Sequence, residues 1–244
     1  MSALGGRVAL VTGGARGIGE AIARALRERG VTVVLGDLSA GDASETALRI
    51  GAEAVALDVR DAESFEVAVL GTFERYGRLD ILVNNAAVTI RRPFFEIDET
   101  EWDEVLAVNL RGVFLGCRIV GQLMRERGTG RIVNVSSLAG QAGSLVNGAH
   151  YAASKAGILA LTKVVARELA PYGVTVNAVA PAAIDGPVMA DLPPEVVEAL
   201  VRSIPVGRLG TADEVAAVVA FLASDEAAFV TGATFDVNGG LLMR

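Results

Sequence analysis

"RVALVTGGARGIG", residues 7–19, decides the fold of this chain, because a short apolar run leads directly into a glycine-rich turn and then a helix-forming segment. A run that is apolar almost throughout is typical of a strand covered on both faces of a sheet. Gly13, Gly17 and Gly19 let the backbone approach a ligand and leave helix N–H groups free to face a pyrophosphate. The stretch therefore predicts a strand, a turn and a helix that bind a dinucleotide.

The alternation of short strands and longer helices continues along the chain. Strands are expected at 7–12, 31–36, 53–57, 80–85, 130–136, 174–180 and 233–237, and helices at 18–29, 62–76, 101–127, 151–170 and 211–223. This order predicts an α/β, doubly wound parallel sheet of about seven strands with helices on both faces, a Rossmann fold. Residues 1–244 are expected to form a single domain, with 181–195 as a mobile loop beside the site.

Composition excludes several classes of function. The net charge of −7 disfavours nucleic acid and an anionic membrane as partners. No apolar window approaches the roughly 20 residues of a membrane span, and the N-terminus does not resemble a signal peptide. The single cysteine, Cys117, suits a reducing compartment, so a cytoplasmic protein is expected. No cluster of His, Cys and carboxylates has the spacing of a metal site.

Three side chains outside the glycine turn indicate chemistry. The second expected strand ends in Asp37, about 20 residues after the last glycine, where a carboxylate can accept hydrogen bonds from ribose hydroxyls. Tyr151 and Lys155 are four residues apart in an expected helix and so share a face. A nearby ammonium favours the phenolate and lowers the pKa of the phenol. The pair therefore predicts a proton-transfer catalyst beside the dinucleotide.

Further motifs occur in a characteristic order: "TGGARGIG" (12–19), "LDV" (57–59), "NNAA" (84–87), "VNLRGVF" (108–114), "IVNVSSLAG" (132–140), "YAASK" (151–155), "NAVAPAAI" (177–184) and "VTGATFDVNGG" (230–240). In these motifs and their spacing, nearly the whole chain resembles the short-chain dehydrogenase/reductase family. The resemblance extends to its 3-oxoacyl-carrier-protein reductases and related alcohol dehydrogenases.

The resemblance implies four catalytic residues. Tyr151 would be the general acid/base, and Lys155 would hold the nicotinamide ribose and lower the pKa of the tyrosine. Ser137, rather than its neighbour Ser136, would bond the substrate oxygen. Asn109 would hold a helix kink and a water that passes protons toward Lys155. His150, directly before the tyrosine, is expected to point elsewhere, in a loop or pocket wall, and Cys117 is expected to lie in the core.

The resemblance also implies a set of cofactor-binding residues: Gly13, Arg16, Gly17, Ile18, Gly19, Asp37, Asp58, Val59, Asn85, Ala86, Tyr151, Lys155, Pro181 and Ile184. Three positions depart from the family pattern. Ala87 and Ala182 replace glycines, and Gly186 replaces a threonine that bonds the nicotinamide carboxamide. That contact is expected to pass to the backbone at Ile184 or to Asp185.

The expected function is hydride transfer between a nicotinamide cofactor and a small secondary alcohol or ketone. NAD is expected as the preferred cofactor because Asp37 repels a 2′-phosphate, although Arg16 could pair with that phosphate in NADP. Two alternatives stay open: an NADPH-dependent 3-oxoacyl-carrier-protein reductase, and an inactive nucleotide-binding regulator. By resemblance, the protein is expected to be a homotetramer built through 101–127, 151–170 and the C-terminal strand.

Overall fold

The computed structural model describes residues 4–143 and 146–243. Within them, seven strands form one sheet in the order β3-β2-β1-β4-β5-β6-β7, and every neighbouring pair is parallel. The strands are β1 (Val8–Thr12), β2 (Thr32–Asp37), β3 (Glu53–Ala56), β4 (Ile81–Asn84), β5 (Gly130–Val135), β6 (Val174–Pro181) and β7 (Thr234–Val237). The expected doubly wound parallel sheet is confirmed.

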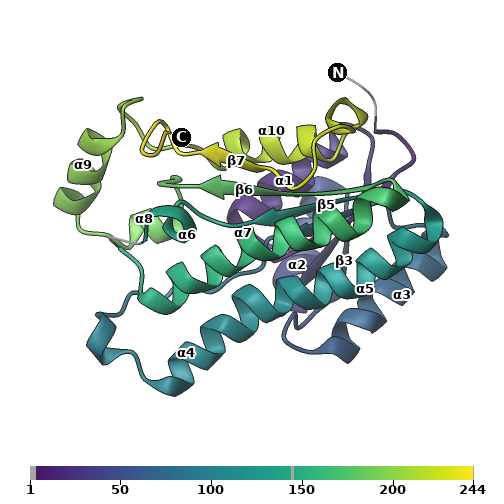
Figure 1. The fold of residues 1–244 in the computed structure, drawn as a ribbon, viewed down its shortest axis with the longest axis horizontal. Coiled ribbons are helices and arrows are strands. Elements are labelled where there is room, and N and C mark those ends of the chain that lie inside the picture. Colours follow the sequence, from purple (N-terminus) through teal and green to yellow (C-terminus); the bar gives the residue numbers. More distant parts are fainter. Residues whose placement is uncertain (1–3, 144–145, 244) are drawn as a thin grey trace.

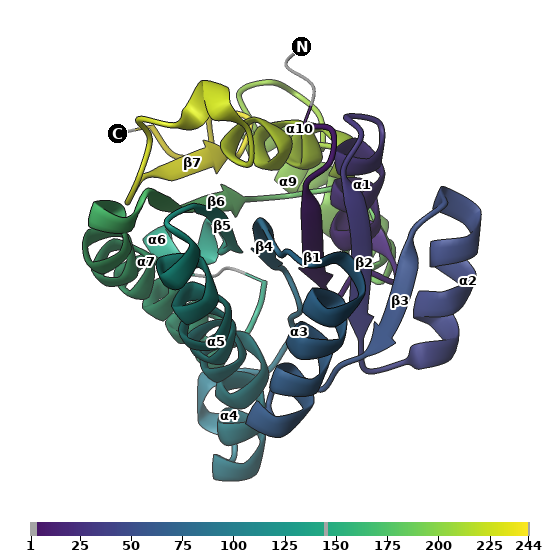
Figure 2. The ribbon, with the colours of Figure 1, turned by 90° about the vertical axis from the view of Figure 1, so that its right-hand side faces the viewer.

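Helices cover both faces of the sheet, with α3, α5 and α7 on one side and α1 and α10 on the other (Figure 2). The described helices are α1 (Gly17–Arg27), α2 (Ala40–Ile50), α3 (Ala62–Tyr76), α4 (Glu99–Leu106), α5 (Gly112–Arg127), α6 (Ala139–Ala142), α7 (Ala149–Leu169), α8 (Pro187–Ala190), α9 (Pro194–Ser203) and α10 (Ala212–Leu222). Short 3-10 turns are η1 (Phe94–Glu96), η3 (Ala170–Tyr172) and η4 (Asp225–Ala227). None of these helices is long and apolar enough to cross a membrane.

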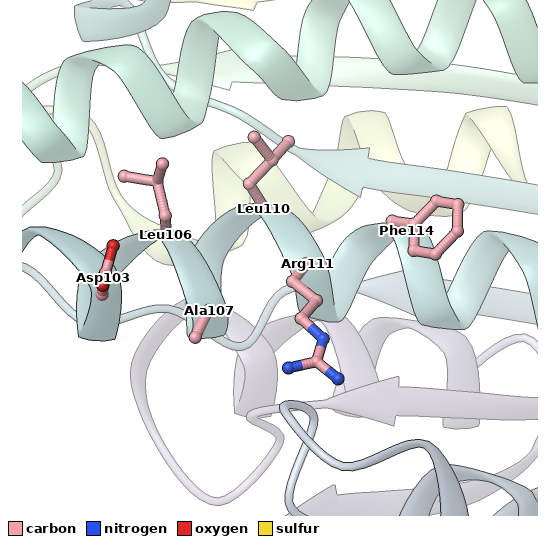
Figure 3. A pocket seen from close by; sticks show the side chains of 6 residues that line it. All are labelled: Asp103, Leu106, Ala107, Leu110, Arg111 and Phe114. Atoms are coloured by element: carbon pink, nitrogen blue, oxygen red, sulfur yellow. The ribbon is translucent and has the colours of Figure 1, made fainter.

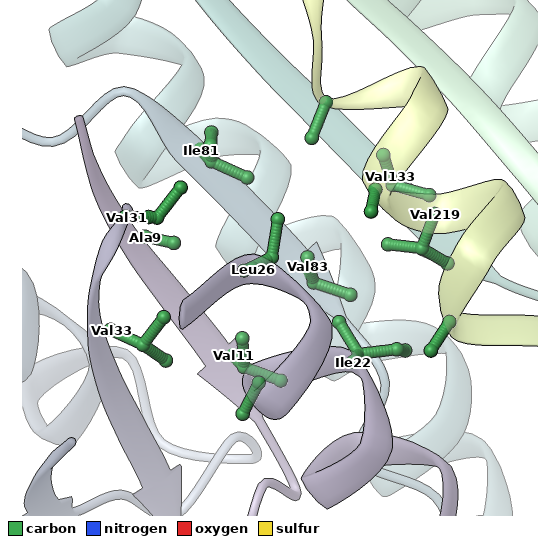
Figure 4. Packing of buried hydrophobic residues seen from close by; sticks show 14 of the residues in the cluster. Ala9, Val11, Ile22, Leu26, Val31, Val33, Ile81, Val83, Val133 and Val219 are labelled. Carbon is green, nitrogen blue, oxygen red and sulfur yellow. The ribbon is translucent and has the colours of Figure 1, made fainter. Parts of the chain in front are cut away.

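β1 shows why the first apolar run folds as a central strand. All five of its residues are buried. Ala9 and Val11 belong to the core beneath α1 and α10, whereas Val8 and Leu10 belong to the core beneath α3, α5 and α7 (Figure 4 draws the first of these cores). Successive side chains of a strand point to opposite faces, so a strand covered on both faces must be apolar at each position. Each buried Val or Leu stabilises the fold by about 1.5–3 kcal/mol.

Four of the described helices were not expected from the sequence: α2, α9 and the single turns α6 and α8. α2 buries only short side chains, Ala43, Thr46 and Ala47, so its apolar periodicity is weak. α9 buries none of its residues fully, and it begins at Pro194, within the proline-rich stretch. The prediction that 181–195 is a loop was therefore wrong in part, because this stretch also contains α8. Proline is favoured in the first turn of a helix, so these prolines start helices rather than prevent them.

The expected helix at 101–127 is interrupted. α4 ends at Leu106, a π-helical turn η2 (Ala107–Arg111) follows, and α5 begins at Gly112. Apolar spacing alone does not reveal a π-turn, because it adds only one residue to a turn of otherwise continuous helix. The π-turn contains Asn109, the residue that the family resemblance placed at a helix kink.

The order of strands identifies the edge where a ligand binds. β1 pairs with β2 on one side and with β4 on the other. The strands from β1 to β3 are added in one direction across the sheet, and those from β4 to β7 are added in the opposite direction. In such folds, ligands bind in the crevice outside the carboxyl ends of the strands at the reversal. The arrowheads of β6 and β7 in Figure 1 point to this edge, where α8 and α9 lie.

Candidate active site

Four predicted site residues lie at this edge of the sheet. Gly13 follows β1, Asn85 follows β4, Ser137 lies just after β5, and Pro181 ends β6. These four strands are consecutive neighbours in the sheet, so segments far apart in the sequence come together. The Leu138 N–H donates to the Pro181 carbonyl oxygen at 2.8 Å, which ties the segment after β5 to the end of β6.

The glycine turn after β1 is held by the segment after β4. The Asn85 amide donates to the carbonyl oxygens of Thr12 and Gly13 at 3.0 and 2.9 Å. The Thr12 hydroxyl accepts the N–H groups of Asn85 and Ala86 at 3.0 and 3.1 Å. Gly13 has φ +63°, and a Cβ there would lie 2.7 Å from the Ala86 Cα. A Cβ on Gly19 would lie 2.1 Å from the Gly13 carbonyl oxygen, so larger residues cannot form this turn.

The start of α1 fits the pyrophosphate of a dinucleotide. The capping position, Arg16, provides no side-chain cap for the free N–H groups of the first turn. By contrast, α3, α4 and α10 are capped by Asp61, Asp98 and Thr211. Gly17, the first residue of the helix, is exposed, and a Cβ there would meet no atom within 4 Å. Free N–H groups at the positive end of a helix dipole are a ready site for phosphate.

Asp37 lies at the end of β2, beside this turn. Its Oδ2 accepts the Ala15 N–H and its Oδ1 accepts the Ser39 N–H, both at 3.2 Å. These bonds hold the carboxylate against the glycine turn, in the position expected for the adenosine ribose. The Arg16 side chain is exposed and makes no hydrogen bond or ion pair with another residue of 4–143 or 146–243. The two residues expected to influence the choice of cofactor therefore differ in how firmly their side chains are held.

The remaining predicted cofactor residues are partly engaged with the protein. Asp58 pairs with Arg60 at 2.7 Å, and this guanidinium holds the pKa of Asp58 below its usual value. Val59 is buried, and Ile18 packs against the core beneath α1. Ile184 forms an isolated bridge with Gly210, whose carbonyl oxygen accepts the Asp185 N–H at 2.8 Å. The Asp185 backbone N–H is thus occupied, which leaves Ile184 as the better backbone candidate for the carboxamide contact.

Tyr151 and Lys155 share one face of α7, as their spacing predicts. The Lys155 Nζ lies 5.6 Å from the centre of the Tyr151 ring and donates to the Val135 carbonyl oxygen at 2.8 Å. The expected lowering of the phenol pKa by Lys155 is not found within the protein chain: burial raises the pKa of Tyr151. Desolvation disfavours the phenolate more strongly than the nearby groups of the chain favour it.

Two hydroxyl groups oppose this effect of burial. The side chains of Ser137 and Thr89 lie near the Tyr151 hydroxyl and lower its pKa. Ser136 instead is buried and donates to the Lys155 carbonyl oxygen at 2.7 Å, so the choice of Ser137 over Ser136 agrees with the geometry. Sequence reasoning missed Thr89. The available signal was a hydroxyl residue two positions after the "NNAA" motif, at the same edge of the sheet.

Asn109 is fully buried in the π-turn. Its Oδ1 accepts the Val88 N–H at 2.8 Å, and its Nδ2 donates to the Val88 carbonyl oxygen at 2.9 Å and to the Ser154 hydroxyl at 3.2 Å. Ser154 in turn donates to the Tyr151 carbonyl oxygen at 2.7 Å. Asn109 therefore joins the segment after β4 to the first turns of α7, while its expected role with a water molecule stays a prediction.

Burial has a large effect on Lys155. It lowers the pKa of this ammonium from 10.5 to about 8. Between these values the unfolded chain binds more protons than the folded one, so this group's contribution to stability rises with pH across the window. Below this pH window, the buried charge of Lys155 lowers the stability of the folded protein by its full cost, about 3 kcal/mol for a shift of this size.

Lys155→Met is therefore expected to stabilise the fold at neutral pH. The lost hydrogen bond to Val135 lowers the free energy of unfolding by about 1 kcal/mol, which leaves a net gain in stability of about 2 kcal/mol. We expect this gain to shrink as the pH is raised toward about 10, measured as the free energy of unfolding in denaturant. Lys163→Met removes the exposed lysine of the same helix and is expected to show no such trend. A gain that is independent of pH would contradict the prediction.

The Cys117 thiol and clusters of possible metal ligands are the remaining candidates for chemistry. Cys117 is buried, as expected, and burial raises the pKa of its thiol to about 12, so it is an inert core residue. Residues 4–143 and 146–243 contain no group of three or more His, Cys, Asp and Glu side chains that could hold a metal ion.

Comparison with known proteins agrees with this geometry. A family model described as enoyl-(acyl carrier protein) reductase matches residues 13–242. The 3-oxoacyl-[acyl-carrier-protein] reductase FabG of Vibrio cholerae is 43% identical over 242 residues, covering 98% of this chain and 99% of that protein. FabG of Thermotoga maritima is 40% identical over 245 residues, with 98% and 99% covered. An uncharacterized oxidoreductase of Mycobacterium bovis is 40% identical over 243 residues, covering 98% of both chains.

These matches extend over almost the whole chain and include the glycine turn, the serine segment and the Tyr-x-x-x-Lys pair. The parallel sheet flanked by helices is the fold that the alternation of strands and helices predicted. The chain therefore belongs to the short-chain dehydrogenase/reductase family of nicotinamide-dependent oxidoreductases.

Proposed function

We propose that the protein interconverts a ketone and a secondary alcohol, with Tyr151 as the general acid/base. The observation that carries this proposal is the placement of the Tyr151 hydroxyl near Ser137, which lowers its pKa, one helical turn from the Lys155 ammonium. A bound nicotinamide would supply or accept the hydride. Tyr151 would give a proton to the carbonyl oxygen during reduction, and Ser137 would hold that oxygen in place.

Lys155 and Asn109 have supporting roles in this mechanism. The Lys155 ammonium would hold the nicotinamide ribose. Its charge would favour the phenolate form of Tyr151 and so oppose burial, which raises the pKa of this tyrosine. Asn109 would hold the water that passes protons toward Lys155. Pro181 and Ile184 would line the nicotinamide side of the cleft, while Asp58 and Val59 would face the adenine.

We propose a 3-oxoacyl thioester as the substrate class. The names of the relatives from Vibrio cholerae and Thermotoga maritima support this alternative over the small alcohol or ketone that the sequence favoured. The acidic charge of −7 had weighed against an acidic carrier protein as partner. Identity over the full length outweighs this argument, because net charge does not describe the local surface at the cleft.

The substrate proposal is tested by steady-state rates with acetoacetyl thioesters and with simple ketones of similar size. We expect kcat/KM to be at least about tenfold higher for the thioesters, equivalent to about 1.4 kcal/mol of additional transition-state binding. Carrier-linked and pantetheine-linked forms separate the contribution of a carrier protein. A preference for simple ketones or secondary alcohols would favour the small-molecule dehydrogenase instead.

We further propose a homotetramer of single-domain protomers, with one contact over the outer face of α4, η2 and α5. Figure 3 shows this face, a shallow, largely apolar hollow of about 460 Å³ lined by Asp103, Leu106, Ala107, Leu110, Arg111 and Phe114. The Phe114 side chain is 45% exposed. Apolar surface of this kind is typical of subunit contacts. The single reduced cysteine is consistent with a cytoplasmic location.

Light scattering is expected to give four times the protomer mass of 25.2 kDa. Phe114→Glu would place a charge in the hollow and is expected to give smaller species at micromolar concentration. Leu48→Glu alters a more exposed apolar residue on α2 and is expected to leave the mass unchanged. A wild-type protein of monomer mass would contradict the tetramer.

A further inference from the structure

His150 is a fully buried side chain that the proposed mechanism does not use. It lies in the first turn of α7, directly before Tyr151, rather than in the loop or pocket wall expected from the sequence. Its Nδ1 accepts the backbone N–H of Tyr151 at 2.8 Å, and its Nε2 lies 3.1 Å from the Glu101 Oε1 on α4. The capping residue of α7, Gly148, has no side chain, so His150 satisfies a free N–H group of this helix from within the first turn.

The two partners determine the state of the imidazole ring. A backbone N–H can only donate, so the Nδ1 that accepts it carries no proton. Arg92 pairs with Glu101 at 2.9 Å and, together with His150, holds the pKa of Glu101 below its ordinary value. An ionised carboxylate can only accept, so the Nε2 carries the proton. Glu101 therefore selects the one neutral tautomer of His150 that can bond to Tyr151.

The imidazole ring packs against Gly148 at the start of α7. A Cβ on Gly148 would lie 2.4 Å from the His150 Cε1, so the ring occupies the space beside this glycine. The Gly148 N–H donates to the Ile90 carbonyl oxygen at 3.0 Å, which joins the start of α7 to the segment after β4. The backbone that carries Tyr151 is thus fixed from two sides before any substrate binds.

The segment 88–92 connects these contacts to the reacting hydroxyl. Four of its residues bond to different parts of the site: Val88 to Asn109, Ile90 to Gly148, Arg91 to the Val188 and Asp191 carbonyl oxygens, and Arg92 to Glu101. Thr89 lies near the Tyr151 hydroxyl and lowers its pKa. The segment therefore lies beside the Tyr151 hydroxyl and also holds the tyrosine backbone, through Arg92, Glu101 and His150.

We propose that His150 and Glu101 are positioning residues for Tyr151, with His150 holding the backbone N–H of the tyrosine and Glu101 selecting the tautomer that does so. The inference rests on the proposed role of Tyr151 as general acid/base. A displacement of about 1 Å at a reacting group can cost up to about 10²-fold in rate, so a bond that fixes the backbone of this group affects turnover. Neither residue takes part in the proton transfer itself.

Three variants of His150 separate the bond to Tyr151 from packing. In His150→Asn, the amide oxygen can take the place of Nδ1 and accept the Tyr151 N–H, although it cannot reach Glu101. In His150→Gln, the amide reaches Glu101 but offers no acceptor at the Nδ1 position. His150→Leu fills the space with neither group. We expect kcat within about threefold of wild type for the Asn variant and about tenfold lower for the other two.

The readouts distinguish positioning from a general loss of structure. The dissociation constant for the cofactor is expected to be unchanged in all three variants, because Asp37 and the glycine turn are untouched. Asp225→Ala is the matched control, since it removes a carboxylate that pairs with Arg7 and Arg131 near the amino ends of β1 and β5. This control should lower the melting temperature without changing kcat.

Glu101 is tested by a double-mutant cycle. Glu101→Leu alone is expected to lower kcat by about fivefold, while the double variant with His150→Leu should be no slower than His150→Leu by itself, because both residues act through one bond. Wild-type kcat in His150→Leu, or equal kcat in the Asn and Gln variants, would overturn the inference. If His150→Leu does not fold, the comparison of kcat between the Asn and Gln variants still tests the inference. Full activity of Tyr151→Phe would instead overturn the proposed function.

Discussion

Tyr151→Phe is expected to lower kcat by about 10²-fold or more, the usual scale for the loss of a general acid or base. The substitution keeps the aromatic ring in α7 and removes the hydroxyl that lies near Ser137 and Thr89. Lys155 is not placed to replace it, because its Nζ lies 5.6 Å from the centre of the Tyr151 ring and donates to the Val135 carbonyl oxygen. Reduction would then lack a proton donor at the carbonyl oxygen.

The measurement is kcat from the absorbance of the reduced nicotinamide, with the cofactor dissociation constant and the melting temperature measured beside it. We expect both of these to remain near their wild-type values, because the hydroxyl contributes little to packing. Tyr172→Phe is a matched control, since it removes the hydroxyl of an exposed tyrosine that bonds Arg125 at 3.0 Å, beyond the end of α7. Turnover close to wild type in Tyr151→Phe would show that another group is the acid.

The second large effect that we expect concerns the choice of cofactor. We expect kcat/KM to be about tenfold or more higher with NAD(H) than with NADP(H), which corresponds to about 1.4 kcal/mol or above. The Asp37 carboxylate is held against the glycine turn by the N–H groups of Ala15 and Ser39, so it cannot withdraw easily. A 2′-phosphate would meet this charge at short range, where repulsion amounts to several kcal/mol. Arg16 is exposed on a flexible stem, and its attraction to the phosphate is weaker.

Two substitutions divide the preference between these residues. Asp37→Ser is expected to shift kcat/KM toward NADP(H), whereas Arg16→Ala should reduce only the use of NADP(H). Glu66→Ser on α3 removes one exposed carboxylate and controls for the change of net charge. A wild-type preference for NADP(H) would mean that Arg16 dominates over Asp37, and it would contradict the predicted preference for NAD(H).

The architecture could be predicted from the sequence because both faces of the sheet are covered. All seven strands lie close to their expected positions. Central strands such as β1 are apolar at consecutive positions because helices cover both faces, whereas the edge strands β3 and β7 are only partly buried. α2 was missed because it buries only Ala43, Thr46 and Ala47, and α9 because it has no fully buried residue. A helix with small or exposed side chains leaves little periodic signal.

The sequence by itself determined the residues that lie beside one another along a single element. Tyr151 and Lys155 are four apart on a helix, and the glycines of the turn after β1 follow directly from local geometry. Asp37 followed from its place at the end of the second strand, about 20 residues after the last glycine, and the family motifs added Ser137 and Asn109. Contacts within one turn of an element depend only on spacing, which a sequence contains.

Only the tertiary structure decided what surrounds the tyrosine. Thr89 comes from the segment after β4, and Glu101 reaches His150 from α4, so no local spacing joins either residue to α7. Burial raises the pKa of Tyr151, although the sequence predicted a lowering from Lys155 alone. Desolvation depends on all the segments packed around a group, and hydrogen bonds between elements depend on how helices sit on the sheet. Neither is a property of one stretch of chain.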